Sequence, residues 1–131
     1  MIVDSSALVA IVRDEPDAER YAVALATAPM VAMSAVNWME AAIVVDSVGD
    51  PASSRRFDDL VRVARIDVVA VTPEQASLAR QAYRDFGRGS GHRARLNFGD
   101  CFSYALAANT GRPLLFKGND FTHTDLASAL D

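Results

Sequence analysis

Cysteine is nearly absent from the sequence: Cys101 is the only one among 131 residues. A lone cysteine cannot form a disulfide within the chain, so the composition suits a reducing compartment, and we expect a cytoplasmic protein. Long apolar runs are missing as well. The apolar N-terminal segment has no basic residues ahead of it and is interrupted by Asp4, Arg13 and Asp14, which argues against a signal peptide and against a membrane span.

Repeats and low-complexity tracts are also missing, and the seven glycines and five prolines are dispersed along the chain. Half of the residues are hydrophobic. A chain of this length and composition buries a sizeable core without disulfides or a structural metal. The sequence therefore predicts a single domain that spans residues 1–131.

Positive charge is in deficit, because the net charge is −4 at pH 7. This balance argues weakly against a protein that coats itself in nucleic acid. Five of the thirteen basic residues nevertheless fall within sixteen positions, namely Arg80, Arg84, Arg88, Arg93 and Arg95. A solvated helix face that runs into a loop explains such a run when it is taken alone.

Short apolar segments alternate with helical patterns along the whole chain. The apolar segments predict buried strands at residues 2–3, 30–33, 67–71 and 114–116. The first helix follows a cap at Ser5 or Ser6, and Pro16 lies in the first turn of the second. Further helices are predicted at residues 35–48, 53–64, 73–86, 99–110 and 125–130.

The clearest helix boundary is formed by Thr72, Pro73 and Gln75, which supply a cap, a first-position proline and a capping-box partner. Gly87 and Gly111 are predicted to end two of the helices. Four strands that alternate with helices indicate an α/β fold of three layers, α/β/α, with a central and mainly parallel sheet.

Four acidic residues share one position in this predicted topology. Asp4 ends the first strand, Glu40 lies about two turns into the helix after the second, Asp100 opens the helix before the last strand, and Asp120 follows that strand. Because strands of a parallel sheet end at the same rim, all four are expected at the rim where α/β sheets bind ligands. Each acid taken singly also has a structural explanation as a helix cap, a solvated side chain or a turn former.

Converging carboxylates need a cation or protons. Two carboxylates 4 Å apart repel each other by about 4 kcal/mol at an effective dielectric constant near 20. Oxygen ligands favour Mg²⁺, with Mn²⁺ as a substitute, and the absence of a Cys/His ligand spacing argues against zinc. A site of this kind activates water and stabilises the leaving oxygen of a phosphodiester, so the pattern points to phosphodiester hydrolysis.

Three stretches of the sequence resemble the PIN-domain ribonucleases, and within them the VapC-type toxins of bacterial type II toxin-antitoxin pairs. MIVDSSALVAIVRDEPDAE is similar to the opening of that family, and SAVNWMEAAIVV resembles its second motif. NFGDCFSYALAANTGRPLLFKGNDF resembles the third and fourth motifs. One departure is Gly118, since many members carry a further Asp two positions before the Asp-Phe pair.

The resemblance implies a function for each of these positions. Asp4, Glu40, Asp100 and Asp120 would be the acidic quartet around one or two Mg²⁺ ions, with Ser6 as a hydroxyl that supports the site. It also implies a metal-dependent endoribonuclease that leaves 5′-phosphate and 3′-hydroxyl ends, a homodimer, and a cognate VapB-type antitoxin that inserts a segment near the site. Phosphate contacts from Arg93, Arg95 and Lys117 are a further hypothesis.

Two other classes of function remain open. A non-catalytic α/β interaction module would use the same acids only as caps. A receiver-like phosphoryl-transfer domain also gathers acids at this rim and uses a lysine after a late strand, as Lys117 would be. Such a domain needs an Asp after a central strand, however, where this chain has Thr72 and Pro73.

Overall fold

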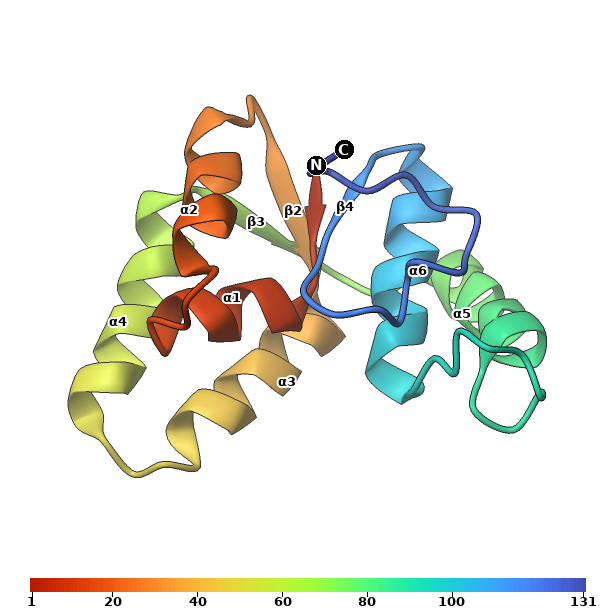
Figure 1. The fold of residues 1–131 in the computed structure, drawn as a ribbon, viewed down its shortest axis with the longest axis horizontal. Coiled ribbons are helices and arrows are strands. Elements are labelled where there is room, and N and C mark those ends of the chain that lie inside the picture. Colours follow the sequence, from red (N-terminus) through yellow and green to blue (C-terminus); the bar gives the residue numbers. More distant parts are fainter.

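The computed structural model describes all residues from Met1 to Asp131. Its four strands form one parallel sheet in the order β3-β2-β1-β4 (Figure 1). The strands are β1 (Ile2–Val3), β2 (Val31–Ser34), β3 (Ile66–Val69) and β4 (Leu114–Leu115). The helices are α1 (Ser5–Val12), α2 (Ala18–Thr27), α3 (Ala35–Asp46), α4 (Pro51–Val63), α5 (Pro73–Phe86) and α6 (Phe98–Thr110). The parallel three-layer α/β fold predicted from the sequence is confirmed.

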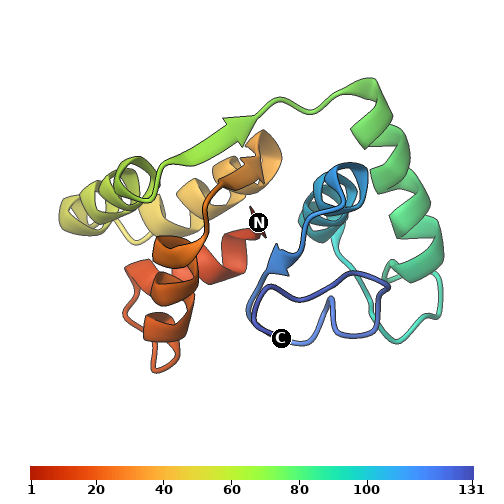
Figure 2. The ribbon, with the colours of Figure 1, turned by 90° about the horizontal axis from the view of Figure 1, so that it is seen from above.

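Helices cover both faces of the sheet. The helices α1 to α4 lie on one side of the strands, and α5 and α6 lie on the other (Figures 1 and 2). Neighbouring residues of a strand point to opposite faces. Accordingly Val3 and Leu115 enter the core beneath α1 to α4, whereas Ile2 and Leu114 enter the core beneath α5 and α6. All four side chains are fully buried, so the short central strands are fixed by packing on two sides.

Register brings the carboxyl ends of β1 and β4 together. Ile2 pairs with Leu114 and Val3 pairs with Leu115. Because these two strands are adjacent and parallel, Asp4 and the segment that follows β4 leave the sheet at the same rim. The rim predicted to hold the acids is therefore formed by β1, β4 and the helices that begin beside them.

The strand β3 differs from its prediction as a buried element. Ile66 is buried, but Asp67 and Val68 are exposed. The physical reason is the position of β3 at the edge of the sheet, where it pairs with β2 alone. An apolar run does not distinguish an edge strand from a central one.

The C-terminal segment 125–130 is not a helix, so this prediction is wrong. Its backbone instead pairs with the edge strand β4. Leu114 donates its N–H to the carbonyl oxygen of Ala127 at 2.9 Å, and Ala129 donates to the carbonyl oxygen of Leu114 at 2.9 Å. The free edge of β4 offers hydrogen bonds that a helix of one or two turns cannot match.

Most helix boundaries agree with the sequence pattern. Thr72 accepts a hydrogen bond from the N–H of Gln75 at 3.1 Å, and Gly111 ends α6 in the left-handed conformation at φ 66°. Pro16 is an exception, since α2 begins only after Asp17.

None of the helices has the length and apolar character that crossing a membrane requires.

Candidate functional site

Asp4 is the buried centre of the rim, with 2% of its surface exposed. Its Oδ2 accepts hydrogen bonds from the N–H of Ser6 at 3.0 Å and from Ser6 Oγ at 2.7 Å. Its Oδ1 accepts a hydrogen bond from Ser103 Oγ on α6. Asp4 is thus the N-cap of α1, and the prediction that Ser5 or Ser6 caps this helix is wrong. The cap and the contact from α6 together fix the orientation of the carboxylate.

Asp100 lies at the third position of α6 and is 6% exposed. Its N–H donates to Asn97 Oδ1 at 2.8 Å, and its Oδ2 accepts from the N–H of Asn97 at 3.0 Å. This is a reciprocal capping box. The structural explanation of Asp100 as a helix cap is therefore confirmed, because the acid is part of the cap.

The hydrogen bonds of the capping box do not offset the cost of burying the charged carboxylate of Asp100. Burial is the largest cause that raises the pKa of this carboxyl, and the negative charges of Asp4 and Asp120 add to it. Against the hydrogen bond from Asn97, which lowers the pKa, the net result is a value of about 8. Three carboxyl groups from β1, α6 and the segment after β4 therefore interact. Without a cation, the cluster retains a proton at neutral pH.

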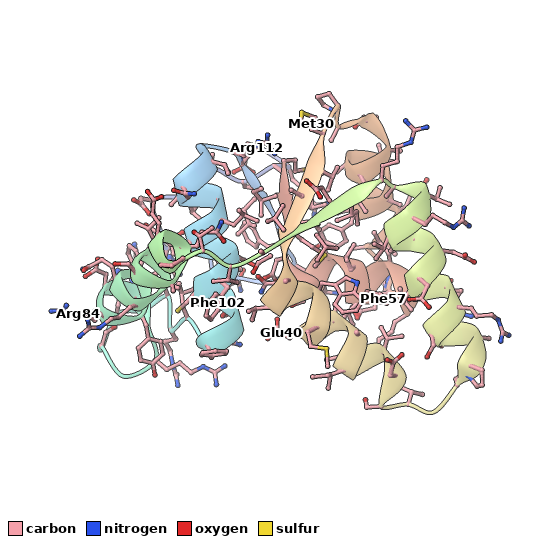
Figure 3. All side chains as sticks on the ribbon, turned by 180° about the vertical axis from the view of Figure 1, so that it is seen from behind. Met30, Glu40, Phe57, Arg84, Phe102 and Arg112 are labelled. Carbon is pink, nitrogen blue, oxygen red and sulfur yellow. The ribbon has the colours of Figure 1, made fainter.

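Glu40 is the fourth of the predicted acids. It belongs to α3 and lies on the side of that helix that faces α6 (Figure 3). Its Oε1 accepts a short hydrogen bond from Ser5 Oγ. A side chain at position 99 would place its Cβ only 2.1 Å from Glu40 Oε2. The absence of a side chain at Gly99 leaves room for the Glu40 carboxylate at the start of α6.

Asp120 is exposed and follows β4 by five residues. It acts on the pKa of Asp100 both as a charge and as a hydrogen-bond partner. The structure thus brings Asp4 and Asp120 close enough to act on Asp100 and places Glu40 at the start of α6.

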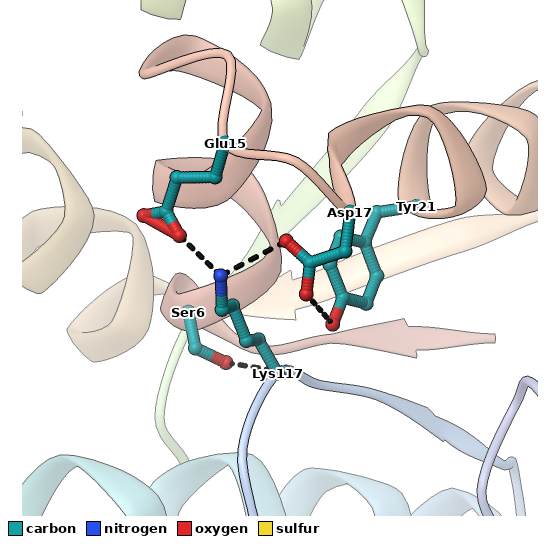
Figure 4. A network of polar contacts seen from close by, with 5 residues as sticks. All are labelled: Ser6, Glu15, Asp17, Tyr21 and Lys117. Atoms are coloured by element: carbon teal, nitrogen blue, oxygen red, sulfur yellow. Dashed lines mark hydrogen bonds and ion pairs between the residues drawn. The ribbon is translucent and has the colours of Figure 1, made fainter.

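Ser6 links Asp4 to the segment after β4, and Figure 4 shows its contact with Lys117 in that segment. While its hydroxyl donates to Asp4, the same Oγ accepts the N–H of Lys117 at 3.0 Å. The Lys117 ammonium donates to Glu15, and to Asp17 Oδ1 at 2.9 Å. Lys117 is consequently held by two carboxylates, and its contact with an RNA phosphate stays a prediction.

Arg93 and Arg95 lie in the segment between α5 and α6 and are exposed. Neither forms an ion pair. Of the three predicted phosphate contacts, these two alone carry charge that no acid of the chain neutralises at short range.

The donor atoms suit a hydrated hard cation. All of them are carboxylate or hydroxyl oxygens, and the raised pKa of Asp100 indicates an excess of negative charge that a divalent ion would relieve. The side chains do not form a ready-made set of three metal ligands. Mg²⁺ usually keeps several waters and is held by one or two carboxylates, so the arrangement fits this ion.

Sequence reasoning missed three polar residues that position the acids, namely Ser5, Asn37 and Ser103. Asn37 is fully buried and donates its Nδ2 to the carbonyl oxygen of Gly99 at 2.9 Å, which ties α3 to the start of α6. Asn37 precedes Glu40 by three positions, and Ser103 follows Asp100 by three. This helical spacing places each on the same face as its acid and was the available signal.

Cys101 takes no part in this chemistry. It is buried, and burial together with the charge of Asp100 raises the pKa of its thiol to about 11. The thiol is therefore not a nucleophile at neutral pH.

Comparison with protein families gives a match to the PIN domain over residues 1–126. The chain is 58% identical to ribonuclease VapC28 of Mycobacterium tuberculosis over 131 residues, which cover 100% of this chain and 98% of that protein. It is 50% identical to ribonuclease VapC30 of the same species over 129 residues, or 98% and 97% of the two chains.

Solved structures show the same fold at low sequence identity. The crystal structure of Mycobacterium tuberculosis VapC20, a sarcin-ricin loop cleaving toxin, superposes with a TM-score of 0.74 at 19% identity and covers 96% of this chain and 95% of that one. A toxin-antitoxin complex from Klebsiella pneumoniae gives a TM-score of 0.71 at 15% identity, with coverage of 95% and 92%.

Proposed function

The chain belongs to the PIN-domain family and to its VapC ribonucleases, and from this premise we propose that Asp4, Glu40, Asp100 and Asp120 form the metal-dependent site at which it hydrolyses RNA. The observation that carries this proposal is the cluster at the sheet rim, where burial and the nearby acids Asp4 and Asp120 together raise the pKa of Asp100 to about 8. In a non-catalytic module, acids that act only as helix caps would not need to lie close to acids from two other elements.

Asp4 and Asp100 are the proposed direct ligands of Mg²⁺, because both are buried and both are oriented by hydrogen bonds from the chain. Glu40 and Asp120 complete the cluster and orient the attacking water. Mn²⁺ is the expected substitute. A divalent ion bound there would lower the pKa of a bound water and offset charge on the leaving oxygen.

The remaining residues of the site hold these acids in place. Ser6 and Ser103 donate to the two oxygens of Asp4, so that neither oxygen turns away from the rim. Ser5 does the same for Glu40. Fixed orientation reduces the reorganisation that the reaction requires, as in other sites whose supporting hydrogen bonds orient the metal ligands.

RNA is the substrate in this proposal, with Arg93 and Arg95 as contacts to its phosphates. Their exposure and lack of ion pairs support this role. Such contacts hold the backbone and carry no sequence preference by themselves.

A cognate VapB-type antitoxin and a second copy of the chain are the proposed protein partners. Large apolar side chains lie beside the site and are exposed: Met39 by 51%, Ile43 by 55% and Phe98 by 72%. With Glu40 and Gly99 they line a cavity of about 530 Å³. An apolar surface of this kind marks a site of protein association, and a cytoplasmic location suits both RNA and the free thiol of Cys101.

The chemistry of the product ends tests the proposed function. RNA incubated with the purified protein and Mg²⁺ is expected to acquire new internal ends with 5′-phosphate and 3′-hydroxyl groups, because water attacks the phosphorus directly. End-specific ligation and sequencing measure this, with an Asp4→Asn variant as the silent control. Cyclic phosphate ends, or equal cleavage by the variant, would rule the mechanism out.

A further inference from the structure

Lys117 joins two parts of the chain through its side chain. Its ammonium lies between Glu15 and Asp17, which belong to the turn between α1 and α2 (Figure 4). These contacts raise the pKa of Lys117 and lower that of Asp17. Because its pKa is raised, the ammonium remains charged throughout the neutral range. All three side chains are about one-third exposed.

The backbone of Lys117 contacts the site directly. Its N–H donates to Ser6 Oγ at 3.0 Å, and Ser6 Oγ donates in turn to Asp4 Oδ2 at 2.7 Å. Because the N–H of Lys117 occupies an acceptor position of the hydroxyl, the hydroxyl proton is directed to Asp4. One residue thus clamps a turn with its side chain and orients a carboxylate through its amide.

The stretch from Lys117 to Asp120 has little else to hold it. None of its backbone N–H groups donates to a backbone carbonyl, and Gly118 adopts φ 96°. At its two ends, the ring centroids of Phe116 and Phe121 lie 5.1 Å apart. Between β4 and Asp120 the ammonium is the only side-chain cation that ties the chain to another element, beside the N–H of Lys117 on Ser6 and the carbonyl oxygen of Asn119, which accepts the N–H of Thr122 at 3.1 Å.

We propose that Lys117 is a positioning residue whose ion pair with Glu15 and Asp17 fixes the segment that carries Asp120 and the amide that orients Asp4 through Ser6. This inference rests on the proposed function of the acidic cluster. It assigns the lysine no contact with RNA. Partly exposed ion pairs contribute little to global stability, so the clamp acts on the geometry of the acids and not on folding.

The test compares Lys117→Met with Lys117→Arg and with a Glu15→Gln/Asp17→Asn double variant. Lys117→Met is expected to lower kcat about tenfold, the lower end of the range for groups that support metal ligands, with KM unchanged. Its affinity for Mn²⁺, titrated by calorimetry in the absence of RNA, falls in parallel. Lys117→Arg restores both quantities. The double variant shifts them in the same direction and adds no further loss to Lys117→Met.

Two comparisons separate the clamp from other roles. Arg62→Met, which breaks the remote pair of Arg62 with Asp59, leaves kcat and Mn²⁺ affinity unchanged. Arg93→Gln/Arg95→Gln lowers the slope of log affinity for RNA against log salt, by about 0.7 for each phosphate that the protein no longer neutralises, whereas Lys117→Met leaves that slope intact. A reduced slope or a raised KM in Lys117→Met, with the double variant fully active, would show instead that Lys117 binds phosphate.

The outcomes also separate this inference from the proposed function. If the wild type and Asp100→Asn cleave RNA equally, the function of the cluster is wrong whatever Lys117 does. If cleavage depends on Asp100 and on metal but Lys117→Met keeps wild-type kcat and Mn²⁺ affinity, the clamp alone is wrong. The double variant keeps side-chain volume, so it decides the matter even where Lys117→Met folds poorly.

Discussion

Replacing Asp100 by Asn is expected to lower the rate of RNA cleavage by roughly a hundredfold or more, which exceeds the usual loss for a group that only supports a metal ligand. The substitution removes a charged oxygen from the cluster but keeps an amide oxygen that can accept the N–H of Asn97, as Oδ2 does now at 3.0 Å. The capping box and the helix are therefore retained. Initial rates on a defined RNA at saturating Mg²⁺ measure the effect.

Asp67→Asn is the matched control, because Asp67 is an exposed acid on the edge strand β3, away from the rim. It is expected to cleave at the wild-type rate. Equal rates for Asp100→Asn and the wild type would remove Asp100 from the metal site and leave it only the role of a cap.

The stability of the metal-free protein is expected to fall as the pH rises from about 4 to about 8. Burial and the charges of Asp4 and Asp120 raise the pKa of Asp100 from 3.8 to about 8. Between these values the folded chain binds a proton that the unfolded chain has lost, so each rise in pH favours unfolding. The stabilisation by the protonated Asp100 is fully present below the pKa of the unfolded chain, 3.8, and is lost as the pH rises through the pKa of the folded chain, about 8.

Chemical denaturation at a series of pH values, in the presence of a chelator, measures this slope. Asp100→Asn is expected to flatten it, since the amide does not titrate, and to be more stable than the wild type near pH 8. Addition of Mn²⁺ stabilises the wild type, increasingly so as the pH approaches 8, because the ion displaces the proton. An identical pH dependence in both proteins would contradict the raised pKa.

The sequence was sufficient to predict the α/β class and the proximity of Asp4 and Asp120 to Asp100. Both depend on short-range patterns, such as the capping residues at Thr72 and the apolar run that ends at Asp4, combined with the rule that parallel strands end together. The family match and the superposed structures confirm the fold that these patterns indicate.

The predictions from the sequence failed where contacts between residues far apart in the chain determine the local structure. Segment 125–130 has a helical pattern, yet its backbone pairs with the open edge of β4. The ion pair of Lys117 with Glu15 was not predicted, because the two residues lie 102 positions apart in the sequence. Ser103 supports Asp4 across 99 positions. Helical spacing places Ser103 on the same face as Asp100, but no local pattern reports which distant residue it contacts, because such pairs exist only once the sheet has brought β1 and β4 side by side.

Caps were also misassigned, for a different reason. At the start of α1, Ser5, Ser6 and Asp4 are all good N-caps by residue type. Asp4 is the N-cap in the structure, because the hydroxyl of Ser6 donates to Asp4 and the hydroxyl of Ser5 donates to Glu40. A residue in this protein therefore serves as a cap and as part of the site at once, so the two interpretations of Asp4 and Asp100 were never exclusive.

The central claim is that four acids from separate elements hold a divalent metal ion. Anomalous diffraction from crystals of the protein soaked in Mn²⁺ tests it most directly, since it locates the ion independently of activity. The account predicts an anomalous peak within ligand distance of carboxylate oxygens of Asp4 and Asp100, which disappears in Asp100→Asn. A peak elsewhere, or no peak in crystals whose dissolved protein cleaves RNA with Mn²⁺, would contradict it.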